Sequence, residues 1–85
     1  MTTKQQRLLK EGLGTYANTV NNAPILNLVD DMQECFEENE SDNASTLGTK
    51  LGDVILNSGM VGLQEHQLTD FYAYWTGVAE AVKSA

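Results

Sequence analysis

The stretch that decides the fold is residues 68–82, LTDFYAYWTGVAEAV. Its large apolar side chains recur every three or four residues, which places them on one face of an α-helix. They are Leu68, Phe71, Trp75, Val78 and Val82, with Tyr72 and Ala79 beside them. Such a stripe is typical of a helix that contributes to the core of a bundle. The sequence therefore predicts a long helix from about Gln64 to Lys83.

Three segments upstream of this helix show the same helical spacing. We expect helices over residues 3–20, 24–39 and 45–58. The alternation of apolar and polar residues that marks a half-buried strand is absent over any useful length. We therefore predict a single all-α domain over residues 1–85, built as a compact bundle of three to four helices.

Several residues are suited to the ends of these helices. Thr3 and Gln6 match the pattern of a capping box at the start of the first helix. Ser45 or Thr46 is expected to cap the third helix. Gly59 is expected to follow its last turn in the left-handed conformation that glycine adopts at low cost.

Two glycines interrupt the third helical segment. Gly48 and Gly52 lie one turn apart on its flank. Because glycine has no side chain, the sequence predicts that another backbone can approach this helix closely there.

The second helical segment contains a run of acid. Residues 30–42 read DDMQECFEENESD, and seven of these 13 residues are carboxylates, with no Lys or Arg among them. They are Asp30, Asp31, Glu34, Glu37, Glu38, Glu40 and Asp42. At about 100° per residue, the first five fall opposite the apolar stripe of the same helix. This run makes the middle of the chain its negative pole and supplies most of the net charge of −7.

An ordered strip of negative charge attracts basic surfaces and is repelled by nucleic acid and acidic membranes. We therefore expect a basic protein partner, such as a nucleic-acid-binding protein whose groove the carboxylates block, and no direct contact with nucleic acid or membrane. The candidate partner-binding residues are the seven acids together with Tyr74, which we expect on the side of its helix opposite the apolar stripe. The competing interpretation of the acids is a solvated helix face.

The function that this pattern favours is that of a small, non-catalytic binding protein that inhibits or modulates its partner. By analogy of size and fold class alone, it fits a phage or mobile-element inhibitor of the DNA-mimic type, such as an anti-CRISPR or anti-restriction protein. An immunity protein for a basic nuclease toxin would likewise dock an acidic surface on a basic one. A third hypothesis is a virion or secretion subunit that assembles through its apolar helix faces. A homodimer is a further alternative.

The chain offers little material for catalysis. Cys35 and His66 are its only Cys and His residues. The carboxylates around Cys35 should raise its thiol pKa and so disfavour the nucleophilic thiolate, and His66 is expected at the surface. We predict neither enzymatic activity nor a cofactor.

A calcium site is also considered. Residues 34–47, ECFEENESDNASTL, and 51–59, LGDVILNSG, resemble an EF-hand and its exiting helix, as in calmodulin and myosin light chains. Residues 63–71, LQEHQLTDF, resemble the entering helix of a next hand. This resemblance would imply calcium binding. The loop, however, lacks the D-x-D-x-D-G arrangement and the closing bidentate glutamate of that family. We therefore expect no metal site.

The remaining features concern location. A lone cysteine excludes an internal disulfide and fits a reducing compartment. The first residues, MTTKQQRLLKEGLG, lack the apolar stretch of about 7–15 residues that a secretory signal requires. We therefore expect the chain in a cytoplasm, that of its host if it is phage-encoded.

Overall fold

The computed structural model describes residues 1–14, 23–59 and 61–85. Four α-helices occur in these ranges: α1 (Thr3–Gly14), α2 (Ala23–Glu38), α3 (Ala44–Asn57) and α4 (Leu68–Ser84). A 3₁₀ turn, η1 (Glu65–Gln67), precedes α4, and the described residues contain no strand. The prediction of an all-α bundle is confirmed.

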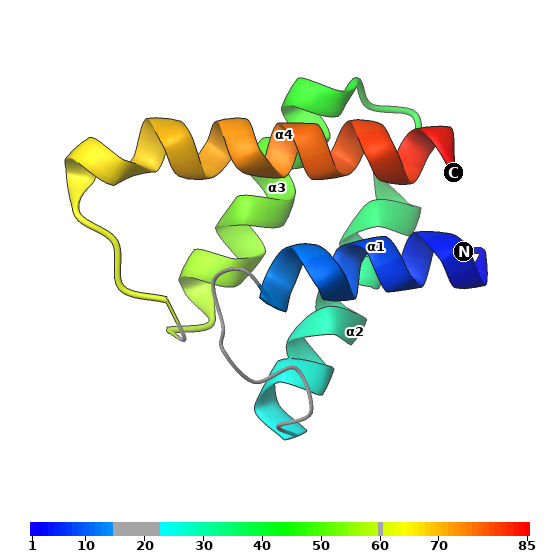
Figure 1. The fold of residues 1–85 in the computed structure, drawn as a ribbon, viewed down its shortest axis with the longest axis horizontal. Coiled ribbons are helices and arrows are strands. Elements are labelled where there is room, and N and C mark those ends of the chain that lie inside the picture. Colours follow the sequence, from blue (N-terminus) through cyan, green and yellow to red (C-terminus); the bar gives the residue numbers. More distant parts are fainter. Residues whose placement is uncertain (15–22, 60) are drawn as a thin grey trace.

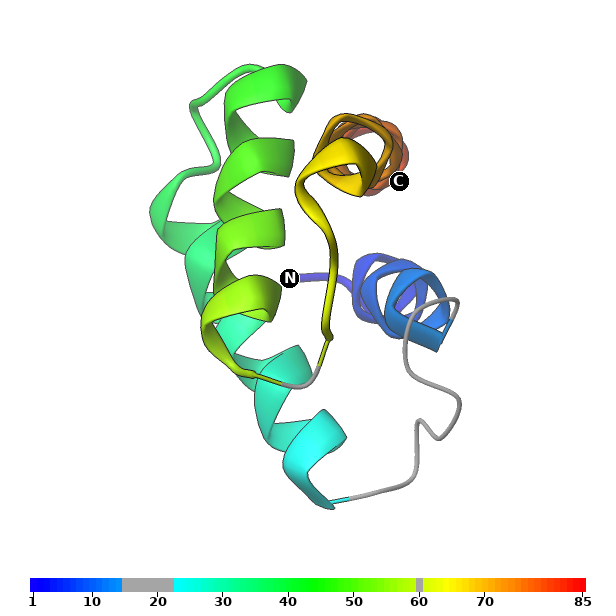
Figure 2. The same ribbon diagram turned by 90° about the vertical axis from the view of Figure 1, so that its left-hand side faces the viewer.

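The helices form two antiparallel pairs that lie across each other. Helix α1 runs antiparallel to α4 in one layer (Figure 1). Helices α2 and α3 form the second layer, and Figure 2 shows them upright while α1 and α4 are seen nearly end-on. The most extensive contact is between α3 and α4, whereas α2 packs on α3 and α1.

The buried apolar residues form one cluster to which all four helices contribute. Its members are Leu9, Leu13, Leu28, Val29, Met32, Phe36, Leu47, Leu51, Ile55, Phe71, Trp75, Ala79 and Val82. Trp75 is the largest of its fully buried side chains, with the Phe71 ring edge-on at a centroid distance of 6.4 Å. The predicted stripe of α4 thus faces the core, and Leu68 and Val78 lie half-buried at its margins.

The glycines of α3 allow the close contact with α4, as predicted. A Cβ atom added to Gly48 would lie 2.5 Å from both the Cα and the N of Thr76. A Cβ at Gly52 would lie 2.9 Å from the ring of Tyr72. Any side chain at Gly48 would therefore force the two backbones apart.

The predicted helix caps require correction. At α1 the Oγ1 of Thr2 accepts from the Gln5 amide at 3.1 Å, and the Gln5 side chain accepts from the Thr2 amide at 2.9 Å. The capping box therefore lies one residue before the predicted pair of Thr3 and Gln6. Residues 2 and 3 are both threonine and residues 5 and 6 are both glutamine, so the sequence fits a capping box at either pair equally well.

The cap of α3 also differs from the prediction. It is Asn43, whose Oδ1 accepts from the Thr46 amide at 2.8 Å, and not Ser45 or Thr46. Asparagine is at least as good an N-cap as serine or threonine, so a local pattern cannot choose between them. Gly59 follows the helix with a φ of +74°, as expected.

The other helix boundaries differ slightly from the prediction. Helix α2 ends at Glu38, close to the expected Asn39. The last helix begins as the 3₁₀ turn and becomes α-helical only at Leu68. The predicted extension of the first helix through residues 15–20 lies outside the described residues.

Candidate functional site

The outward face of α2 is the most strongly charged surface on the described helices. Leu28, Met32 and Phe36 hold this helix against the core. Because these residues share one face, the carboxylates between them must point away from it. Asp30, Asp31, Glu34, Glu37 and Glu38 are all exposed, as predicted, and we call these five residues the acidic strip.

The acidic strip receives little compensation from the rest of the fold. Glu37 lies 3.4 Å from the amino group of Met1. None of the other four carboxylates forms an ion pair with a residue that the structure describes. The last turn of α2 contains no basic residue, although cations are favoured at the negative end of a helix dipole. The strip is thus a local excess of negative charge.

Glu40 and Asp42, which we also predicted as binding residues, lie beyond the strip in the turn between α2 and α3. Asp42 is half-buried, and its carboxylate accepts from Lys50 at 2.6 Å. Lys50 also donates to the side chain of Asn39 at 2.7 Å. Lys83 of α4 donates to the backbone carbonyls of Glu40 and Asp42. These two lysines fix the turn and neutralise Asp42, so its charge does not extend the strip.

Tyr74 does not lie where the sequence placed it. Its side chain is half-buried and packs against the core cluster. The hydroxyl donates to the carbonyl of Gly12 at 2.9 Å, and the ring stands edge-on to Trp75 at a centroid distance of 5.3 Å. The expectation that Tyr74 faces away from the apolar stripe is wrong. Helix α4 has neighbours on two sides, α3 and α1, so its buried arc is wider than one stripe.

The two residues considered for catalysis lie on separate elements, Cys35 on α2 and His66 in η1. His66 is exposed in η1, as expected. Cys35 is half-buried, and its thiol pKa is raised, mainly by burial and further by Glu38 and Asp42. The predicted direction is correct, but burial contributes more than the carboxylates. Among the described residues, no group of three or more His, Cys, Asp or Glu side chains is arranged to hold a metal ion.

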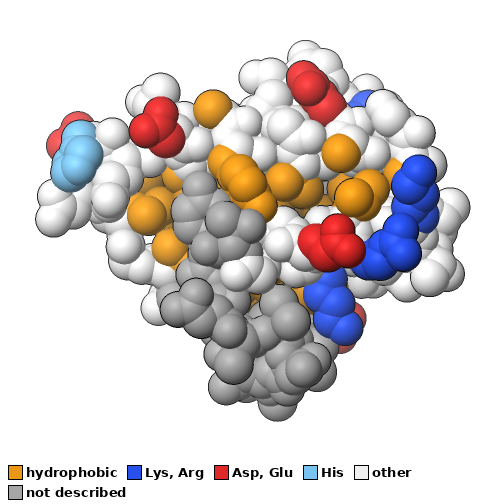
Figure 3. All heavy atoms as spheres, viewed as in Figure 1, with side chains coloured by type: hydrophobic (Ala, Val, Ile, Leu, Met, Phe, Trp, Pro, Cys, Tyr) orange, Lys and Arg blue, Asp and Glu red, His pale blue; other side chains and the backbone are white. Residues whose placement is uncertain are grey.

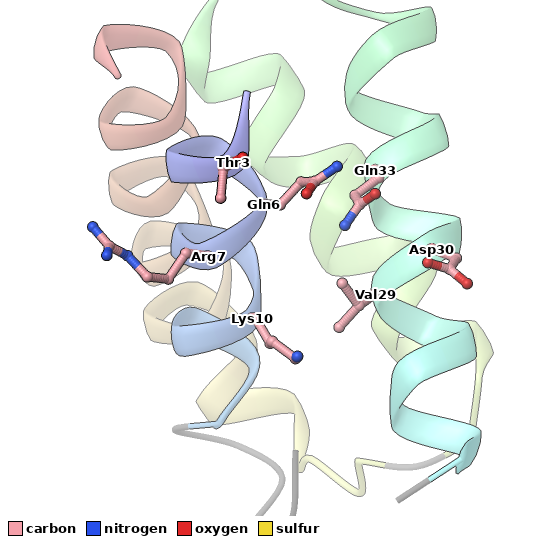
Figure 4. A pocket seen from close by; sticks show the side chains of 7 residues that line it. All are labelled: Thr3, Gln6, Arg7, Lys10, Val29, Asp30 and Gln33. Carbon is pink, nitrogen blue, oxygen red and sulfur yellow. The ribbon is translucent and has the colours of Figure 1, made fainter. Parts of the chain in front are cut away.

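The structure also reveals a cleft that the sequence did not suggest. It lies between α1 and α2 and has a volume of about 330 Å³ (Figure 4). The lining residues are Thr3, Gln6, Arg7, Lys10, Val29, Asp30 and Gln33. Periodicity within one helix cannot reveal such a site, because the cleft is formed by the relative placement of two helices.

Positive charge gathers on a different helix from the acidic strip. Lys4, Arg7 and Lys10 are all exposed on α1, and Lys and Arg side chains cluster over this helix in Figure 3. Arg7 lies 3.8 Å from Glu11 of the same helix. The fold thus separates a basic helix from an acidic one.

Comparison of the chain with protein-family models, curated proteins and solved structures gives no match. Within the described residues, no helix combines the length and the apolar character that crossing a membrane requires.

Proposed function

We propose that this protein is a non-catalytic binding protein whose acidic strip docks on a basic surface of another protein and inhibits or modulates it. The observation that carries the proposal is the isolation of the strip. Its five carboxylates are exposed on one helix face, and the lysines that could have neutralised them are placed elsewhere. Lys50 and Lys83 bind the turn after α2, while Lys4 and Lys10 lie on α1.

The arrangement of the strip lowers the stability of the free protein. Glu34 lies three or four residues from each of the other four carboxylates, and each such like-charge pair on a helix costs about 0.2–0.5 kcal/mol. The total is about 1–2 kcal/mol, a noticeable part of the roughly 4–13 kcal/mol expected for a domain of this size. Interspersed lysines would provide solubility without this cost, so a docking role accounts for the pattern better than solvation alone.

The spacing of the charges supports a nucleic-acid-binding protein as the partner. Residues 30–38 span about 12 Å of helix, which gives roughly one carboxylate every 3 Å along the axis. One strand of duplex DNA carries a phosphate about every 3.4 Å along its axis. A groove that accepts one DNA strand would thus meet a similar line of charge on α2. This density favours a DNA-mimic inhibitor, of phage or mobile-element type, and suits an immunity protein for a nuclease equally well.

The assembly hypothesis receives less support. It requires apolar helix faces that close only when several copies associate. In the described residues, all four helices instead bury apolar side chains in one common core.

The proposal is tested with a charge-neutralised strip and a matched control. Glu34→Gln/Glu38→Gln removes two charges from the strip, and Glu65→Gln/Glu80→Gln removes two exposed charges from η1 and α4. Binding to a basic DNA-binding domain is measured between about 50 and 200 mM salt, with duplex DNA as competitor.

We expect wild-type binding to weaken as salt rises and DNA to compete with it. The strip variant should associate more slowly than the control variant, because steering depends on the local potential. It should also be more stable by about 1 kcal/mol, since it loses like-charge pairs. Equal binding by the two variants would show that only net charge matters and that the strip is a solvated face.

A further inference from the structure

The cleft between α1 and α2 presents polar groups from both helices over an apolar base. Figure 4 shows Gln6 and Lys10 of α1 extending toward α2, and Val29 and Gln33 of α2 extending toward α1. Val29 is only 5% exposed and Gln33 is half-buried. The head groups of Arg7 and Asp30 point away, so these two residues line the cleft with their stems.

The polar groups that face the cleft are not used by the rest of the described chain. Neither the amides of Gln6 and Gln33 nor the ammonium of Lys10 forms a hydrogen bond or ion pair with a described residue. Neighbouring side chains on α1 behave differently. Gln5 donates to the carbonyl of Val82 at 3.0 Å, and Arg7 pairs with Glu11. As far as the described residues go, the cleft therefore holds one unpaired cation and two amides, each of which can both donate and accept.

These groups define the chemistry of a ligand. An ammonium attracts an anion and repels a cation, and its hydrogen bonds to a carboxylate are of the stronger, charge-assisted kind. Paired amides suit a peptide bond, which also both donates and accepts. Val29 offers contact to a small apolar side chain. The volume of about 330 Å³ lies at the lower end of the range for ligand sites.

We propose that this cleft binds the C-terminal residue of a peptide. The terminal carboxylate accepts from Lys10, the last peptide bond pairs with Gln6 and Gln33, and the terminal side chain packs on Val29. This site borders the acidic strip at Asp30, whose carboxylate points away from the cleft, and it does not depend on the role proposed for the strip. One charge-assisted hydrogen bond and two amide hydrogen bonds in an open cleft correspond to a dissociation constant on the order of 1 mM.

The test uses the full chain labelled with ¹⁵N and three small probes. N-acetyl-Ala-Ala carries the carboxylate and the peptide bond, its C-terminal amide lacks the charge, and acetate lacks the peptide bond. The side-chain NH₂ signals of Gln6 and Gln33 should shift and saturate with N-acetyl-Ala-Ala. Lys10→Gln should weaken this binding about tenfold or more, whereas Lys4→Gln, which removes an exposed charge from α1 outside the cleft, should leave it unchanged.

Four results would overturn the proposal. No saturable shift with N-acetyl-Ala-Ala means that the cleft is only a surface feature. Equal binding of the amidated peptide removes the role of Lys10. Equal binding of acetate, or equal weakening by Lys4→Gln, reduces the effect to general attraction of anions by α1.

Discussion

Gly48→Ala is the sharpest test of the contact between α3 and α4. The new Cβ would lie 2.5 Å from the Cα and N of Thr76 and 2.7 Å from its Oγ1, whereas carbon atoms pack at about 3.5–4.0 Å. The Thr76 backbone cannot turn aside as a flexible side chain can, so the helices must separate by about 1 Å. Overpacking of this kind costs roughly 1–3 kcal/mol, and a backbone clash belongs at the upper end.

The intrinsic preference of alanine for helix acts in the opposite direction. It offsets about 1 kcal/mol, which leaves a net destabilisation of about 2 kcal/mol. In a domain of this size, that loss corresponds to a decrease in Tm of about 8–16 °C. Urea unfolding followed by far-UV circular dichroism would measure the change directly.

Gly77→Ala provides the matched control. Gly77 is an exposed glycine of α4, and a Cβ there would meet no atom within 4 Å. The same substitution should therefore stabilise the protein by about 0.5–1 kcal/mol through helix preference alone. The two variants should thus change stability in opposite directions. If Gly48→Ala is neutral or stabilising, α4 does not approach α3 as closely as the structure shows.

Two further predictions concern the core and the thiol. Trp75→Ala should lower the free energy of unfolding by about 3–5 kcal/mol, measured by urea unfolding followed by far-UV circular dichroism, because the ring is fully buried. A loss below about 1 kcal/mol would place the ring at the surface. Burial raises the pKa of Cys35, so at about pH 8 iodoacetamide should modify the folded chain more slowly than the urea-unfolded chain. The raised pKa also makes stability depend on pH. Below the ordinary thiol pKa of about 8.5, the neutral Cys35 contributes to the stability of the folded chain, and this contribution is lost as the pH rises through the raised pKa. Cys35→Ser should remove this part of the alkaline loss of stability, and an unchanged pH profile would contradict the assignment.

The parts of the fold that the sequence predicted are those that depend on local spacing. The buried face of α4 and the opposed faces of α2 follow from 3.6 residues per turn, and both are confirmed. The helix caps were misplaced by one to three residues, because Thr2 and Thr3, or Asn43 and its neighbours, satisfy the same local rule.

The incorrect or missing predictions depend on long-range packing. Tyr74 sits on a second buried face of α4 because α1 covers it. Lys83 contacts the turn after α2 across 43 and 41 positions of the sequence, at Glu40 and Asp42. The cleft likewise requires two helices to be placed side by side. No pattern within a single helix carries this information.

The packing of α2 allows acidic charge to collect on its outer face. Helix α4 lies against both α1 and α3, and α3 lies against both α4 and α2. Helix α2 also has two neighbours, α3 and α1, but it contacts them through one buried stripe, so its outer positions are not required for the core. Its outer positions can carry like charges at a cost of about 1–2 kcal/mol without disturbing packing. The fold therefore confines the repulsion between carboxylates to one face of α2. A basic partner that covers this face would replace that repulsion with attraction.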